Sequence, residues 1–131
     1  MKIDKQKQLV IWAAGCAEHA LPCFERIYPK DARPRNAIKA ARDWVHNRIK
    51  VSEARTAALA SHAAARKARD PSAVAAARAA GHAAATAHVA GHALAAADYA
   101  ADAVGVAAWV KEREWQRKRI PKTLTRFIFK R

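Results

Sequence analysis

Histidines in one alanine-rich segment are the first residues whose spacing could support chemistry. His82, His88 and His92 lie in GHAAATAHVAGHALAAADYA, residues 81–100. On a continuous helix His88 and His92 would share one face, a spacing that can hold a metal ion. His82 would lie about 240° round the helix from His88, so the three imidazoles would form one site only if the helix bends.

The segment lacks the rest of a zinc enzyme. A zinc site needs three or four ligands, and a zinc hydrolase of this type carries a glutamate directly after its first histidine. We therefore expect no metal ligand and no cofactor. We interpret the three histidines as buried polar side chains that hydrogen-bond to carbonyls or to neighbours such as Tyr99, which fixes the register of alanine-rich helices. A cleft for a partner or small ligand, and a histidine-dependent metal-binding protein or hydrolase, remain alternatives.

Two further histidines receive the same interpretation. His19 precedes Pro22, where a carbonyl is free to accept a hydrogen bond, and His62 lies in ALASHAAA. No nucleophile accompanies them, because the serines lie in helical or capping contexts and Cys16 lies on an apolar face. We expect no catalytic residue and predict that the protein is not an enzyme.

The formal charge of +14 is concentrated at the C-terminal end. Residues 111–131 carry +7, whereas residues 71–110 carry −1. Such a balance favours an acidic partner, either protein or nucleic acid. We predict two partner-binding groups: Arg35, Lys39, Arg42 and His46 on the open face of one helix, and Arg117, Lys118, Arg119 and Arg126 near the C-terminus.

The elements that position these side chains are helices. Alanine, the best helix former, supplies 36 of 131 residues, and few β-branched or aromatic runs compete with it. We predict an all-α single domain, an alanine-rich bundle of about five antiparallel helices with short loops. The predicted helices cover residues 5–20 with a short piece after Pro22, then about 34–50, 53–69, 71–89 and 92–118.

The chain after Pro121 is expected to differ from the bundle. We assign residues 1–120 to the helical domain and residues 121–131 to a basic, partly apolar tail. Its basic residues alternate with aromatic ones and could contact phosphates and stack on bases. Alternatively, the apolar side chains of the tail pack back on the bundle.

Three segments together resemble a known family. They are WAAGCAEHALPCFERIYPKDARPRNAIKAARDW (12–44), EARTAALASHAAARKA (53–68) and AAARAAGHAAATAHVAGHALAAADYA (75–100). The series resembles the immunity proteins of bacterial polymorphic toxin systems, in their fifth class, over roughly residues 9–105. The resemblance implies a small all-α cytosolic domain that neutralises a cognate toxin by binding.

The sequence thus predicts an immunity-type binding protein whose partner is an acidic protein, a toxin. The alternative is a basic nucleic-acid-associated protein that uses its C-terminal tail. MKIDKQKQLV shows no signal peptide, so we expect a cytoplasmic protein, and charged residues interrupt its longest apolar segment, so we expect no membrane contact. Exposed small-residue faces also leave a homodimer open.

Overall fold

Alanine-rich sequence produces helices throughout the computed structural model, which describes residues 4–129 apart from the side chain of Phe127. The helices are α1 (Lys5–Ala20), α2 (Pro22–Glu25), α3 (Arg33–Val45), α4 (Val51–Lys67), α5 (Pro71–Ala85), α6 (His92–Ala103), α7 (Trp109–Arg119) and α8 (Thr125–Ile128), with short 3-10 helices η1 (Val106–Ala108) and η2 (Lys122–Leu124). The described residues contain no strand, and the predicted all-α single domain is confirmed.

Capping side chains mark the starts of α1 and α5. The Asp4 side chain accepts a hydrogen bond from the Lys7 backbone N–H at 2.8 Å at the start of α1. Asp70 does the same for Ala73 at 3.0 Å at the start of α5, where Pro71 occupies the first turn. Pro22 begins α2 directly after α1.

The helix ends differ more from prediction. The helix expected over 34–50 ends at Val45, and Asn47 takes a positive φ of 62°. The helix expected over 71–89 ends at Ala85, and a non-helical turn precedes α6. The positive φ of Asn47 follows the end of α3, whereas Thr86 at the end of α5 keeps helical φ and ψ, so propensity alone locates neither end.

The prediction of one fifth helix over 92–118 is wrong. The chain bends by 116° between α6 and the segment Val106–Arg119. Gly105 adopts φ 92°, a left-handed conformation that glycine alone takes without steric penalty. The Trp109 Nε1–H donates to the Asp102 carboxylate at 3.3 Å across the bend.

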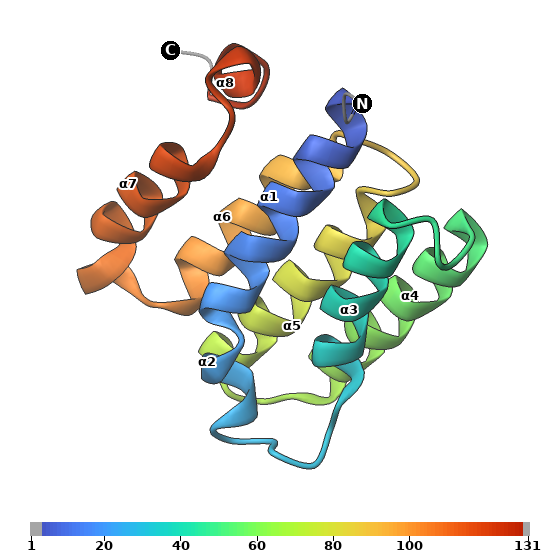
Figure 1. Cartoon of the computed structure of the whole chain (residues 1–131). Coiled ribbons are helices and arrows are strands. Elements are labelled where there is room, and N and C mark those ends of the chain that lie inside the picture. Colours follow the sequence, from blue (N-terminus) through green and yellow to red (C-terminus); the bar gives the residue numbers. More distant parts are fainter. Residues whose placement is uncertain (1–3, 130–131) are drawn as a thin grey trace.

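Helix α5 lies at the centre of the bundle. It contacts α1, α3, α4 and α6, and Figure 1 shows α1 and α3 crossing in front of the layer formed by α6, α5 and α4. Most of its buried side chains are alanine, which lets helices approach closely. Larger side chains, among them Phe24, Val10 and Leu124, fill the remaining core.

Helices α7 and α8 pack along the other side of α1 from α3 (Figure 1). The Trp12 indole N–H donates to the Gln116 carbonyl at 2.8 Å, and the Trp12 ring meets Phe129 edge-on with centroids 5.6 Å apart. Leu124 is 1% exposed. Part of the chain after Pro121 therefore packs on the bundle, while the division into a domain and a tail at residue 120 stays a prediction.

Within residues 4–129 no single helix has both the length and the apolar character to cross a membrane. Only the bent pair of α6 with Val106–Arg119 meets that test, by combined length and composition.

Candidate partner-binding site

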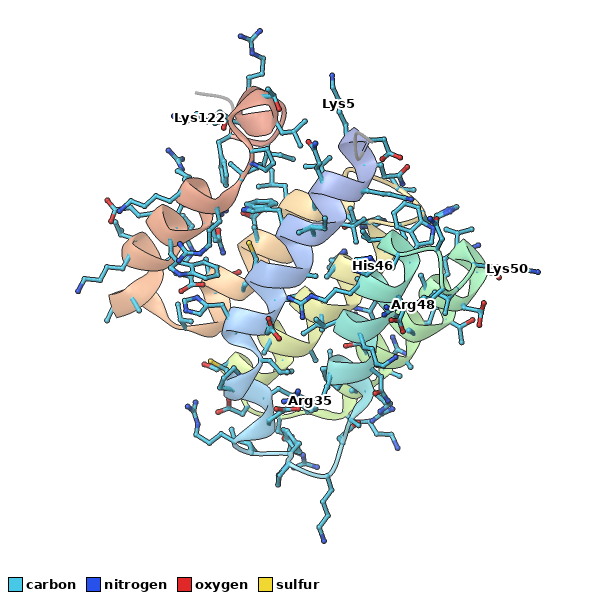
Figure 2. The ribbon with its side chains drawn as sticks, viewed as in Figure 1. Lys5, Arg35, His46, Arg48, Lys50 and Lys122 are labelled. Carbon is cyan, nitrogen blue, oxygen red and sulfur yellow. The ribbon has the colours of Figure 1, made fainter. Side chains whose placement is uncertain are left out.

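The exposed face of α3 carries the first predicted group of cations. Arg35, Lys39, Arg42 and His46 recur at helical spacing, so they lie on one side while Ala37, Ile38, Ala41 and Val45 are buried on the other. All four predicted residues line one groove of about 480 Å³ between α1 and α3. Figure 2 shows Arg35 at one end of α3 and His46 at the other.

The groove has an apolar floor and a charged rim. Leu21 and Ile38 line it, and both are almost completely buried. Glu18, Asp43 and Arg48 join the predicted cations around it.

Carboxylates of α1 and α2 pair with Arg42 and Arg35, two of the arginines that line the groove. Arg42 donates from both terminal nitrogens to the two oxygens of Glu18, at 2.9 and 3.1 Å. Arg35 makes a second two-point contact with Glu25, at 2.5 and 2.8 Å. The bond from Arg42 lowers the pKa of the Glu18 carboxyl, and the bond to Glu25 raises the pKa of Arg35. The Glu18 carboxylate is therefore held as an anion.

A third carboxylate forms ion pairs with two cations. Asp43 accepts from Lys39 at 2.7 Å and lies 3.6 Å from Arg48. The bond from Lys39 lowers the pKa of Asp43. Around the groove, the four cations Arg35, Lys39, Arg42 and Arg48 face the three carboxylates Glu18, Glu25 and Asp43.

Sequence reasoning found the cations but missed these carboxylates. The Lys39–Asp43 pair was recognisable because the residues are four apart on one helix. Glu18 and Glu25 lie on α1 and α2, so only the tertiary packing brings them to α3. The predicted open basic face is thus a face of paired charges.

The second predicted group lies on the far side of α1 (Figure 1). The Arg117 guanidinium stacks 4.8 Å from the Phe129 ring centre, and that of Arg119 lies 4.0 Å from the Trp115 ring centre. Lys118 and Arg126 are exposed. The structure therefore presents two basic groups on either side of α1, and the aromatic rings near the second group already contact arginines of this chain.

Polar contacts hold α7 against the bundle. His19 Nδ1 lies 2.7 Å from the buried Glu112 carboxylate, and the Trp115 ring stacks on the His19 ring with centroids 3.8 Å apart. Gln116, fully buried, donates to the Ala97 carbonyl at 2.8 Å. Arg113 bonds to both Gln116 and Asp98.

His19, predicted in the core, is instead 43% exposed and pairs with a carboxylate that sequence reasoning did not single out.

The remaining histidines group differently from prediction. His82 and His92 bring their Nδ1 atoms within 3.0 Å, His62 lies edge-on to His82 with centroids 4.8 Å apart, and Tyr99 stacks on His82 at 5.3 Å. His88 is exposed. The helical spacing predicts that His88 and His92 share a face and that His82 lies apart from them. This prediction is wrong, because α5 ends at Ala85 and the chain turns before α6.

A glycine makes room for this cluster. A Cβ at Gly81 would lie 2.6 Å from the His62 ring, so the ring occupies space that only glycine leaves free. The Nδ1 atom of His62 is buried without a hydrogen-bond partner. Burial lowers the pKa of His62, and it lowers that of His82 to about 4, so both rings are neutral at pH 7.

The arrangement offers little for metal or covalent chemistry. No three His, Cys, Asp or Glu side chains in the described part of the chain are placed to hold a metal ion. Burial raises the pKa of the Cys16 thiol to about 12, which keeps it protonated at neutral pH.

Comparison with known proteins gives one match. The family model described as "Imm-5 like putative immunity protein" matches residues 1–123. Neither the curated proteins nor the solved structures contain a match.

Proposed function

The chain belongs to the Imm-5 like family of immunity proteins, and we propose that it neutralises a cognate bacterial toxin by binding it. The family match over residues 1–123 is the observation that supports this proposal most directly. The protein acts by occlusion, covering an acidic surface or the mouth of the toxin's active site, in the cytoplasm of the cell that makes it.

Binding without catalysis agrees with the chemistry of the candidate residues. His62 and His82 are neutral imidazoles packed against each other, and Cys16 is a protonated thiol in the core. The side chains at the surface with the best geometry for recognition are instead cations. We assign partner contact to the α3 group of Arg35, Lys39, Arg42 and His46, and to the C-terminal group of Arg117, Lys118, Arg119 and Arg126.

Co-expression with a toxin domain tests the function. The candidate toxin to be tested is a toxin-like protein encoded by a reading frame beside that of this chain, and the readout is growth of a bacterial host. We expect the wild-type chain to restore growth and to bind the purified domain. Growth arrest despite abundant folded wild-type chain would overturn the proposed function.

A matched pair of variants tests the α3 residues. One variant replaces Arg35, Lys39, Arg42 and His46 with glutamine, and we expect it to lose protection. The control replaces Arg55, Lys67, Arg69 and His88, which are exposed cations and a histidine outside the groove. Both variants remove two arginines, one lysine and one histidine, so equal protection by both would refute the assignment to α3.

A further inference from the structure

We propose that the groove between α1 and α3 is a carboxylate-binding site, kept in shape by the chain's own glutamates, and that it receives an acidic segment of the partner protein. This inference rests on the proposed function, because the partner would be the toxin. It goes further by naming the chemistry that the groove recognises.

Two arginine forks define the recognition geometry. Arg35 and Arg42 each present two parallel N–H donors to a carboxylate, the arrangement by which arginine selects planar anions. The residues are seven apart on α3, so their backbones are separated by about 10.5 Å along the helix axis. A matching partner carries two carboxylates at about that spacing, such as residues i and i+7 of a helix.

The internal carboxylates act as exchangeable occupants. Arg42 is 41% exposed and Glu18 55%, whereas Arg35 is 61% exposed and Glu25 only 26%. Ion pairs this exposed contribute little net stability, because water screens the charges and both side chains lose freedom. An incoming carboxylate can therefore replace Glu18 at little cost in stability and the less exposed Glu25 at a greater cost, while the glutamates hold the arginines in position until then.

The floor of the groove favours protein over nucleic acid. Most of the surface that lines the groove is apolar although Leu21 and Ile38 are almost completely buried, so an apolar side chain of the partner would contact mainly the aliphatic stems of the arginine and lysine side chains. The described lining includes no Trp, Tyr or Phe ring on which a base could stack. An acidic segment with an apolar residue between its carboxylates fits both features.

A defined peptide tests the site without the toxin. The probe is a fluorescein-labelled, alanine-based helical peptide with Glu at positions i and i+7 and Leu at i+4, titrated with the full-length protein at 50 mM and 150 mM NaCl. We expect at least tenfold weaker binding when both Glu are replaced by Gln. A 20-nucleotide single-stranded DNA is titrated in parallel, and tighter binding of the DNA than of the peptide at the same groove would overturn the proposal.

Charge-preserving variants locate the binding. Arg35→Lys with Arg42→Lys keeps both charges and removes both forks, so we expect about tenfold weaker peptide binding. Arg55→Lys with Arg69→Lys is the control and should change binding less than twofold. Equal affinity of the two double variants, with unchanged thermal unfolding, would show that the forks do not bind the peptide.

The role of the internal glutamates has its own signature. Glu18→Gln removes a competing occupant, and we expect it to tighten peptide binding several-fold. Glu114→Gln changes the net charge equally at an exposed position on α7 and should have a smaller effect. If both substitutions tighten binding equally, general charge explains the result and the exchange proposal fails.

These outcomes separate the inference from the proposed function. Peptide binding that depends on the forks, without protection from the toxin, would support the groove and overturn the function. Protection that survives loss of both forks, with no peptide binding, would support the proposed function and overturn the carboxylate-binding groove.

Discussion

Mild acid should destabilise this protein through His82. Its Nδ1 atom lies 3.0 Å from that of His92, so in the neutral pair one ring donates and the other accepts. Protonation of His82 would place a charge in a partly buried site. Burial lowers the pKa of His82 from 6.5 to about 4, and the charges of His62, His92 and Arg78 act in the same direction.

The sign and size of the effect follow from proton linkage. The unfolded chain binds a proton at its ordinary pKa of 6.5, whereas folded His82 binds one only near pH 4. Stability is therefore greatest above pH 6.5 and falls as the pH drops through the interval from 6.5 to 4. The full difference corresponds to about 3 kcal/mol at most, and partial exposure of the ring reduces it to about 1.5 kcal/mol. The lowered pKa of His62 adds loss in the same direction.

Urea unfolding followed by tryptophan fluorescence measures this loss. Between pH 7.5 and 5 we expect the free energy of unfolding to fall by about 1 kcal/mol. The lowered pKa values of Glu18 and Asp43 act only below their ordinary values of 4.5 and 3.8, so they leave this interval to the histidines. His82→Gln should remove most of the slope, whereas His88→Gln, at an exposed position, should keep it. A wild-type free energy that is constant from pH 7.5 to 5, or the same slope in both variants, would refute the reasoning.

Three further substitutions test the packing. Gly81→Ala should destabilise the wild type by about 1–2 kcal/mol, because its Cβ would lie 2.6 Å from the His62 ring. In a His62→Ala background the same substitution should stabilise the protein, because alanine has the higher helix propensity. Equal effects in the two backgrounds would contradict the clash. Gln116→Ala removes hydrogen bonds to Ala97 and Arg113 at a fully buried position. We expect the free energy of unfolding, measured with urea, to fall by about 1–3 kcal/mol. The control Glu114→Ala, at an exposed position, should cause no measurable change. Leu124→Ala should lower the free energy of unfolding by about 2–4 kcal/mol, because the Leu124 side chain is 1% exposed. Lys122→Ala is the control at an exposed position. Equal melting temperatures of the two variants would mean that the segment after Pro121 does not stabilise the fold.

Local signals in the sequence were sufficient for the starts of α1, α2 and α5, whereas α4 begins at Val51, two residues before its predicted start. Asp4, Pro22 and the Asp70–Pro71 pair each act through the backbone of their own first turn, so no distant contact is needed to interpret them. The break at Gly105 is different. Glycine inside a helix costs only about 1 kcal/mol relative to alanine, so local propensity does not decide between a bend and a continuous helix. The polar contacts of α7 with α1 and α6 favour the bend, and these exist only in the folded chain.

The same limit applies to the candidate site. The helical period placed Arg35, Lys39, Arg42 and His46 on one face, and the structure brings all four to one groove. The carboxylates that occupy two of these cations come from α1 and α2, at separations of 24 residues for Glu18 and 10 for Glu25. The histidine grouping failed for a related reason, because an angle counted along one helix has no meaning across the turn that separates His82 from His92.

Alanine-rich helices present similar surfaces to one another, so their alignment must be specified by something other than apolar shape. Two buried polar side chains provide this information, because each bonds to a particular carbonyl of another helix: Ser61 donates to Ala77 at 2.8 Å, and Gln116 to Ala97 at the same distance. Residues whose types suggest chemistry, including His62, whose ring packs against Gly81, thus take part in packing. Substitutions at these positions should change unfolding more than partner binding, whereas substitutions of Arg35 and Arg42 should change binding with little effect on unfolding. A recognition surface in such a bundle is therefore best sought among exposed cations in exposed ion pairs, such as Arg42 with Glu18 in the groove between α1 and α3.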